Sequence, residues 1–199
     1  MKKITIIILM SMLLLGSVCF IDFNICKLSY NRNKNEADEV LKIAHNLVDS
    51  RDTSNELQNA NNNTNKIEND VIGILYIEEL DLEAPVKEGT TQEVMKTSIG
   101  HFTESDFWNG NVSLASHNSG TSMHYFQNIH KLKINDEIKY KTQLGEKVYK
   151  IKSIDTIKDT DWSMVEKNKN TDTKENTITL ITCINGQPNY RLCVRGVEI

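Results

Sequence analysis

Two side chains near the end of the sequence, Cys183 and Arg191, have the types and spacing expected of a nucleophile and its supporting cation. Cys183 closes the strand-like run ITLITC, and Arg191 stands near the start of a second run, YRLCVRGV. The connecting segment contains Asn, Gly and Pro, so the two runs predict a β-hairpin whose turn-proximal residues face each other. A guanidinium beside a thiol favours the thiolate, because the opposite charge stabilises the ionised form. The hairpin therefore predicts an activated cysteine.

The second run carries two arginines and a further cysteine on one face. Side chains alternate along a strand, so Arg191, Cys193 and Arg195 point to the same side. Of the two arginines, Arg191 lies closer to the first cysteine, and we expect it to be the functional one. Cys193 sits in an ordinary apolar pattern and is expected to be buried.

A catalytic cysteine also needs a group that accepts and donates protons, usually a histidine from elsewhere in the chain. Of the five histidines, only His117 ends an apolar strand-like run, VSLASHN, much as Cys183 ends its own. We expect His117 to move the protons. His101, His124 and His130 are expected to be structural or on the surface, with His124 as a reserve proton shuttle.

Three motifs, TLITC at 179–183, RLCVRG at 191–196 and LASHNSG at 114–120, together resemble the sortase family. Sortases are cysteine transpeptidases on the surface of Gram-positive bacteria. The resemblance covers roughly residues 70–199. With an N-terminal membrane segment and no lid segment carrying an Asp-Pro-Trp plug, the plan looks more like class D than class C. The resemblance implies an eight-stranded β-barrel with short helices.

The resemblance to sortases also implies a reaction. The Cys183 thiol would attack a sorting motif of LPxTG type on a secreted protein and cleave it after the threonine. The acyl group would then pass to an amine of peptidoglycan or its precursor. His117 would protonate the leaving amine and deprotonate the incoming one, while Arg191 would stabilise the developing charge or hold the substrate backbone.

Several further residues are expected to bind substrate. Thr182 resembles the threonine of the family motif, and the backbone N–H of Ile184 is a candidate oxyanion donor. Trp162 lies in the connection before the cysteine strand, either as a buried anchor of that loop, which we favour, or as a substrate contact. Apolar groove candidates, which also fit a barrel core, are Val86, Leu114, Ala115, Ile181 and Val194.

Two other functions share these residues. A thiol hydrolase would release the acyl group to water, and a membrane-tethered binding barrel would keep Cys183 buried and inert. No Cys/His set has metal-ligand spacing and no Gly-rich phosphate loop occurs, so we expect neither metal nor cofactor. The net charge of −4 without a basic block argues against a nucleic-acid partner.

The sequence predicts that these residues are positioned by a mainly β domain over residues 70–199. Many short strands with turn residues between them favour a closed or nearly closed barrel. Short helices are expected at Thr91–Lys96 and Met123–Ile129. The expected strands are Val71–Ile77, Ala84–Glu88, Val112–Ser116, Glu137–Thr142, Lys147–Ile157, Thr177–Cys183 and Tyr190–Glu198.

The N-terminal third differs in character. Lys2 and Lys3 precede an apolar run to about Ile21, close to the ~20 residues of a spanning helix, so residues 1–22 predict a signal peptide or a membrane anchor. No A-x-A-like cleavage site follows the run, and we favour an uncleaved single-pass anchor with the domain outside the cell over a segment that is removed. Residues 23–69 are expected to form a juxtamembrane helix and a linker. The helix, at about 33–57, is amphipathic and fits either a solvated stalk or packing on the domain. The polar stretch 59–66 predicts the linker.

Overall fold

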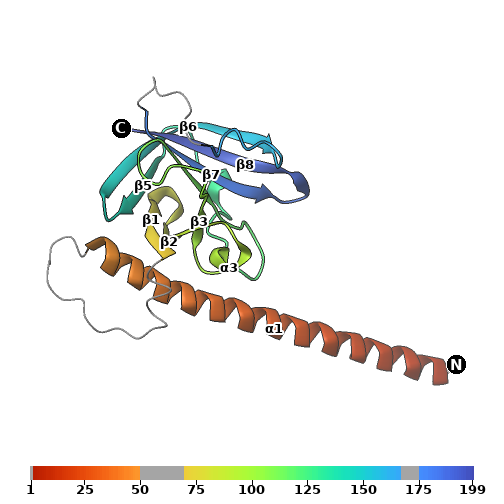
Figure 1. Ribbon diagram of the computed structural model, residues 1–199. Coiled ribbons are helices and arrows are strands. Elements are labelled where there is room, and N and C mark those ends of the chain that lie inside the picture. Colours follow the sequence, from red (N-terminus) through yellow and green to blue (C-terminus); the bar gives the residue numbers. More distant parts are fainter. Residues whose placement is uncertain (1, 50–69, 167–174) are drawn as a thin grey trace.

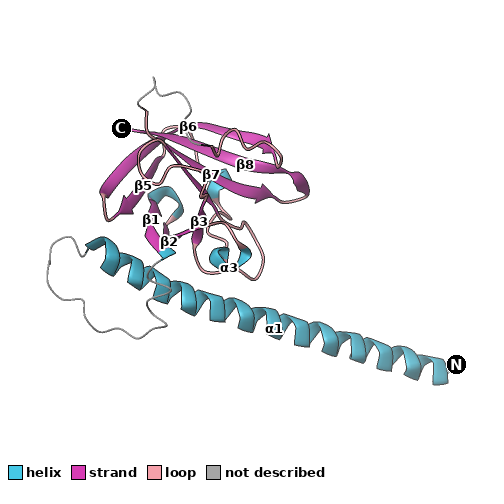
Figure 2. Ribbon diagram, viewed as in Figure 1, coloured by secondary structure: helices cyan, strands magenta, loops and turns pink. Residues whose placement is uncertain are grey.

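The computed structural model describes residues 2–49, 70–166 and 175–199, with side chains from residue 18 onward. Within these residues, eight strands close into a barrel and few helices accompany it (Figures 1 and 2). The strands are β1 (Val71–Ile77), β2 (Leu82–Glu88), β3 (Ile99–His101), β4 (Asn111–Ala115), β5 (Glu137–Thr142), β6 (Gly145–Lys158), β7 (Thr177–Ile184) and β8 (Gln187–Glu198).

The strand order around the barrel is β1-β2-β3-β4-β7-β8-β6-β5, and β5 pairs with β1 to close it. The pairs β2/β3 and β4/β7 are parallel, whereas the other neighbours are antiparallel. In a parallel pair both strands end at the same edge. The pairing of Ala115 with Ile181 therefore brings the exits of β4 and β7 together.

The β7–β8 hairpin is confirmed, with a tighter turn than expected. Its connection is the dipeptide Asn185-Gly186, and Gly186 has a φ of 76°. Glycine adopts a positive φ without steric cost, so Gly186 suits the second position of this turn, and asparagine is a frequent turn former at the first. Strand β8 consequently begins at Gln187 rather than at Tyr190.

The barrel interior is filled by one apolar cluster that includes Tyr140 and Tyr149. Along β7 and β8 the side chains alternate: Leu180 and Val194 belong to this interior cluster, whereas Ile181 and Cys193 belong to a second cluster on the opposite face. The prediction that Cys193 and Val194 point to opposite faces of β8 is thus confirmed. The outer cluster underlies the site described below.

The predicted strands agree with the observed ones apart from their ends and one omission. Strand β3 has only three residues, too few to show an alternating pattern. The first short helix is confirmed as α3 (Gln92–Met95), where the Thr91 hydroxyl accepts the Val94 N–H as an N-cap. The helix expected at 123–129 is wrong: this segment is mostly turn and ends in the 3₁₀ helix η3 (Ile129–Lys131). A further 3₁₀ helix, η2 (Glu78–Leu80), follows β1.

A single long helix, α1 (Lys2–Asp49), runs past the side of the barrel that carries β1 and β2 (Figure 1). Its C-terminal part packs Val40, Ala44 and Val48 on Val71 and Ile74 of β1. Of the two interpretations left open for the amphipathic segment, packing on the domain therefore holds as far as Asp49. The predicted remainder of this helix and the predicted linker at 59–66 lie outside the described residues.

The N-terminal half of α1 projects away from the barrel (Figure 1). The helix runs without interruption across the boundary expected at residue 22. Among the helices of the described residues, none combines the length and the apolar character needed to cross a membrane. Large apolar side chains that are exposed on α1 are Val18, Phe20, Ile21, Phe23, Ile25 and Leu28.

Candidate active site

A cavity of about 270 Å³ lies over the outer cluster, with its floor on β4, β7, β8 and β6. Its walls come from the α3 region and from the connection after β6. All three residues expected to be catalytic line it: His117, Cys183 and Arg191. The structure thus brings together side chains from β7, from β8 and from the segment that follows β4.

The parallel β4/β7 pair is what places His117 near Cys183. Beyond the last ladder pair, the Ser116 N–H donates to the Ile181 carbonyl at 3.4 Å. The Thr182 hydroxyl, which is buried, then donates to the Ser116 carbonyl at 2.7 Å. The residue before the histidine is therefore tied to the residue before the cysteine.

A second tie, which sequence reasoning missed, comes from Asn118. Its Nδ2 donates to the Cys183 carbonyl at 2.6 Å and to Asn185 Oδ1 at 3.1 Å. Asn118 thereby links the segment after His117 to the hairpin turn. Its position directly after the histidine, at the exit of a strand, is the signal that could have identified it.

The His117 ring is half-buried, and its Nε2 atom is buried with no hydrogen-bond partner among the described residues. Burial lowers the pKa of His117 below its usual 6.5, and the nearby charge of His124 lowers it further. A neutral imidazole with a free ring nitrogen can accept a proton. This is the state that a proton shuttle needs before an amine or thiol approaches.

The two cysteines of the hairpin differ in exposure. Cys183 is exposed at the cavity, whereas Cys193 is fully buried, as expected. Burial raises the pKa of the Cys193 thiol to about 12, which keeps it protonated and unreactive. Both cysteines are free thiols.

Arg191 stands directly opposite Cys183 in the β7/β8 ladder. Its Nη1 donates to the carbonyls of Pro188 and Tyr190 at 2.7 and 2.8 Å, and its Nη2 lies 3.9 Å from the Asp159 carboxylate. These contacts hold the guanidinium near the turn of the hairpin. A cation fixed there can meet a negative charge or a substrate carbonyl that enters the cavity.

The residues expected to bind substrate separate into two groups. Ala115, Thr182 and Trp162 line the cavity. Leu114 does not, because its side chain is completely buried in the barrel interior. The groove candidates Val86 and Val194 are buried in the same interior, whereas Ile181 lines the cavity.

Trp162 is not the buried anchor of its loop. Its side chain is 55% exposed and meets Phe102 edge-on, with ring centroids 5.9 Å apart. The loop is anchored instead by Val165, which is 3% exposed and packs in the outer cluster. The indole is therefore open to a ligand in the cavity.

Cys183 also borders a second cavity, of about 450 Å³. Ile184 lines this second cavity, and Thr182 is shared by both. Its wall is mixed: Phe126, Ile184 and Leu192 lie beside polar side chains, among them Asn118, Gln127, His130, Asn185 and Gln187. Cys183 thus borders two cavities, and the second offers more hydrogen-bonding groups than the first.

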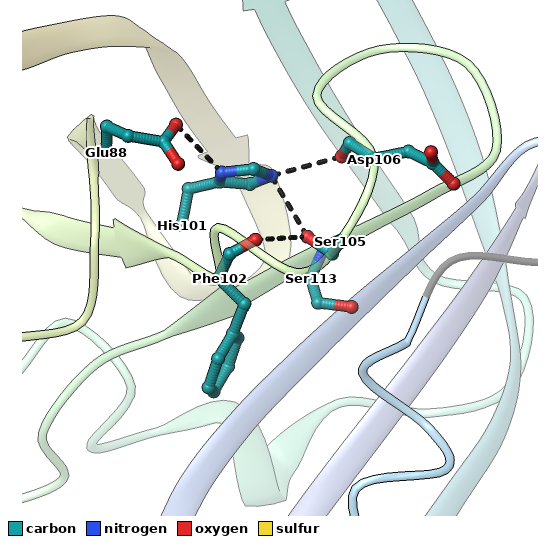
Figure 3. A network of polar contacts seen from close by, with 6 residues as sticks. All are labelled: Glu88, His101, Phe102, Ser105, Asp106 and Ser113. Carbon is teal, nitrogen blue, oxygen red and sulfur yellow. Dashed lines mark hydrogen bonds and ion pairs between the residues drawn. The ribbon is translucent and has the colours of Figure 1, made fainter.

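His101 has the structural role expected of it, in a network of polar contacts (Figure 3) next to Phe102, which lines the first cavity. The buried ring lies between the Glu88 carboxylate, 3.0 Å from Nδ1, and two oxygens, the Asp106 carbonyl and the Ser105 hydroxyl, each 3.0 Å from Nε2. The Ser105 hydroxyl in turn donates to the Phe102 carbonyl at 2.8 Å. This network fixes the turn that presents Phe102 to the cavity.

The comparisons with known proteins agree with this geometry. The family model described as "Sortase domain" matches residues 75–199. A solved structure of a Clostridium perfringens Sortase D5 transpeptidase is similar, with 27% identity, a TM-score of 0.59 and coverage of 86% of this chain and 98% of that chain. A comparison with curated proteins finds no match.

Two further solved structures share the fold. Streptococcus pneumoniae Sortase C has 22% identity and a TM-score of 0.59, covering 83% of this chain and 89% of that chain. Clostridium perfringens sortase C, solved with the C-terminal cell wall sorting motif, has 20% identity and a TM-score of 0.59, covering 83% and 94%. At these identities the likeness concerns the fold.

Proposed function

This chain belongs to the sortase family of cysteine transpeptidases, and from that premise we propose that Cys183, His117 and Arg191 form its catalytic centre. The observation that carries the proposal is their presence around one cavity, with the thiol exposed and a buried imidazole nitrogen unpaired. An inert binding barrel does not fit this arrangement, because that function requires a buried Cys183.

The first half of the reaction forms a thioester. His117 accepts the proton of the Cys183 thiol and becomes the imidazolium. The thiolate attacks the carbonyl of the substrate threonine, and the resulting oxyanion is stabilised by Arg191 and by the Ile184 N–H. As the C–N bond breaks, the leaving amine takes a proton from the His117 imidazolium. The acyl group then remains on sulfur.

The second half transfers the acyl group. An amine attacks the thioester, gives a proton to the now neutral His117, and displaces the Cys183 thiolate. The second cavity beside Cys183 supports transfer over simple hydrolysis, because it offers space and the side-chain amides of Asn118, Gln127 and Asn185 to a second substrate while the first cavity is filled. We therefore favour an amine of peptidoglycan or its precursor over water as the acceptor.

The acyl donor is proposed to be a secreted protein with an LPxTG-like sorting motif. The first cavity supplies apolar surface for its leucine and proline from Ala115, Ile181 and the exposed indole of Trp162. The similar sortase C of Clostridium perfringens was solved with a cell wall sorting motif, which supports this substrate class. The likeness to a Sortase D5 structure supports assignment to class D.

A peptide assay tests the proposed centre. The full-length chain, incubated with a fluorogenic LPxTG peptide and a short peptide carrying a free amine, should form a thioester on Cys183 that mass spectrometry detects. Cys183→Ala and His117→Ala should abolish ligation, whereas the exposed control thiol variant Cys26→Ser should not. Full cleavage by Cys183→Ala would overturn the proposal, and cleavage without ligation would establish a hydrolase.

Sortases are generally associated with the membrane at the cell surface. For this chain we propose a single-pass attachment through the start of α1, with the barrel outside. Support comes from the apolar run after Lys2 and Lys3 and from the exposed apolar side chains at residues 18–28.

Two natural cysteines test this topology. Cys19 lies within the proposed span and Cys26 just beyond it. In intact cells a membrane-impermeant maleimide should label Cys26 and leave Cys19 unmodified, with Cys183→Ala present to remove the reactive thiol. Equal labelling of both cysteines, or recovery of the chain in the soluble fraction, would contradict the attachment.

A further inference from the structure

The segment after β4 carries His117 but has little regular structure of its own. From residue 117 to residue 128 the backbone forms bends and turns. One backbone hydrogen bond joins it to the end of α3, from the Met123 N–H to the Lys96 carbonyl at 2.9 Å, and another lies within it, from the Phe126 N–H to the His117 carbonyl at 3.2 Å. Towards the barrel, the Asn118 amide bonds to the Cys183 carbonyl and Phe126 is buried in the interior cluster. The position of the imidazole therefore depends on how this segment, which we call the histidine loop, is held.

Helix α1 makes a separate contact with the histidine loop. Asn33 Nδ2 donates to the Thr121 carbonyl at 3.0 Å. One turn earlier, the Tyr30 ring stacks on the His124 ring, with centroids 5.5 Å apart and planes at 29°. Residues three apart lie on one helical face, so Tyr30 and Asn33 contact the loop at adjacent points.

This contact is distinct from the packing that docks α1 on the barrel. The docking residues lie further along the helix, where Val40, Ala44 and Val48 meet β1. Ion pairs at the same end join His45 to Glu83 and Asp49 to Lys141. Tyr30 and Asn33 contact the loop and do not belong to the docking cluster, so their role can be separated from helix docking by mutation.

The loop contact reaches the site through His124. His124 lies close enough to His117 for its charge to lower the pKa of that ring. The ring that α1 holds by stacking is therefore an electrostatic neighbour of the proposed proton shuttle.

We propose that Tyr30 and Asn33 of α1 are positioning residues for the reaction, which hold the histidine loop so that His117 stays at the cavity with Cys183. The proposal rests on the proposed function, because it assigns significance to the placement of His117. Helix α1 then has a role besides attachment, because its residues Tyr30 and Asn33 help to hold the loop that carries His117. A displacement of the imidazole by about 1 Å is enough to slow proton transfer strongly.

The test compares Tyr30→Ala, Asn33→Ala and the double variant of the full-length chain in the peptide ligation assay. We expect kcat to fall about tenfold in each while KM stays within about twofold, because the donor cavity is unchanged. Tyr30→Phe keeps the ring and should restore kcat. Because both residues hold one segment, the double variant should lose less than the product of the single losses.

Two controls separate positioning from general stability. Lys34→Ala removes an exposed neighbour on the same turn and should leave kcat unchanged. Val40→Ala loosens helix docking without touching the loop; it should lower the melting temperature and leave kcat, measured well below that temperature, unchanged. Wild-type kcat in both Tyr30→Ala and Asn33→Ala, or an equal kcat loss in Val40→Ala, would overturn the inference.

The outcome is distinguishable from failure of the proposed function. If His117→Ala retains full ligation, the catalytic assignment itself is wrong. If His117→Ala is inactive while the two α1 variants match the wild type, only the positioning role of α1 is wrong.

Discussion

At the scale of single residues, the site depends on a few hydrogen bonds that join its two halves. The Thr182 hydroxyl and the Asn118 amide both bridge the segment after β4, which carries His117, and strand β7, which carries Cys183. Each of these donors bonds to a backbone carbonyl, so they set the relative position of His117 and Cys183 rather than the chemistry of either group. Their effect should appear mainly in kcat.

Thr182→Val tests this tie. The change keeps the shape of the side chain and removes the donor, which leaves the Ser116 carbonyl at a buried position without its partner. We expect a loss of about 1–2 kcal/mol in the free energy of unfolding and a fall of about tenfold in kcat. Thr182→Ser, which retains the hydroxyl, should have a free energy of unfolding in urea titration and a kcat in the ligation assay that are both close to those of the wild type.

The titration of His117 gives a second prediction at this scale. Its pKa is lowered chiefly by burial and also by His124, so NMR should find an inflection below the usual 6.5. His124→Gln removes a like charge and should raise the pKa of His117, which moves the corresponding inflection of the rate profile to higher pH. An unchanged or lower value in His124→Gln would contradict the coupling.

The same shift has a consequence for stability. Since the unfolded chain binds a proton at His117 more readily than the folded chain does, the free energy of unfolding should fall as pH drops from the usual pKa towards the lowered one. His117→Gln should reduce this slope. Urea titrations of both proteins across that interval measure it.

At the scale of elements, α1 contributes through an apolar face that only the barrel can cover. Ala44 is completely buried between the helix and β1. Because the charge is unpaired in an apolar interface, Ala44→Asp should cost on the order of 3 kcal/mol in helix docking. The neighbouring exposed position Lys42 provides the control, since Lys42→Asp should have a much smaller effect.

Hydrogen exchange distinguishes loss of docking from unfolding of the domain. In Ala44→Asp the amides of α1 between Asn33 and Asp49 should exchange faster, while those of β7 and β8 stay protected. Equal loss of protection in the barrel would mean that the helix is required for the whole fold.

At the scale of the whole molecule, the barrel is closed by the short β1/β5 pairing. Gly73 lies at this seam, where an added Cβ would stand 2.5 Å from the Lys141 carbonyl oxygen. Gly73→Ala should therefore push β1 and β5 apart and lower the free energy of unfolding by roughly 2–3 kcal/mol. Ile72→Val, at the preceding position, should lower the free energy of unfolding by less than Gly73→Ala does in the same urea titration. If Gly73→Ala has the smaller effect of the two, the β1/β5 pairing is not tightly packed at Gly73.

The sequence was sufficient for whatever depends on neighbours along the chain. Strand alternation and the Asn185-Gly186 turn paired Cys183 with Arg191 and separated the faces of β8, because a hairpin brings together residues that are already close in sequence. The prediction that Leu114 and Ala115 both line the groove was wrong for one of them, because adjacent residues of one strand point to opposite faces. Only Ala115 does.

Tertiary structure alone decided which distant segments meet. The parallel pairing of β4 with β7 brings His117 to Cys183, yet neither strand carries a local signal for its partner, since such pairing is selected by the packing of the whole barrel. The same holds for β3, which is too short for a pattern, and for the exposure of Trp162 beside Phe102. It holds also for α1, whose apolar face fitted a stalk or a docked helix equally well until the barrel supplied Val71 and Ile74.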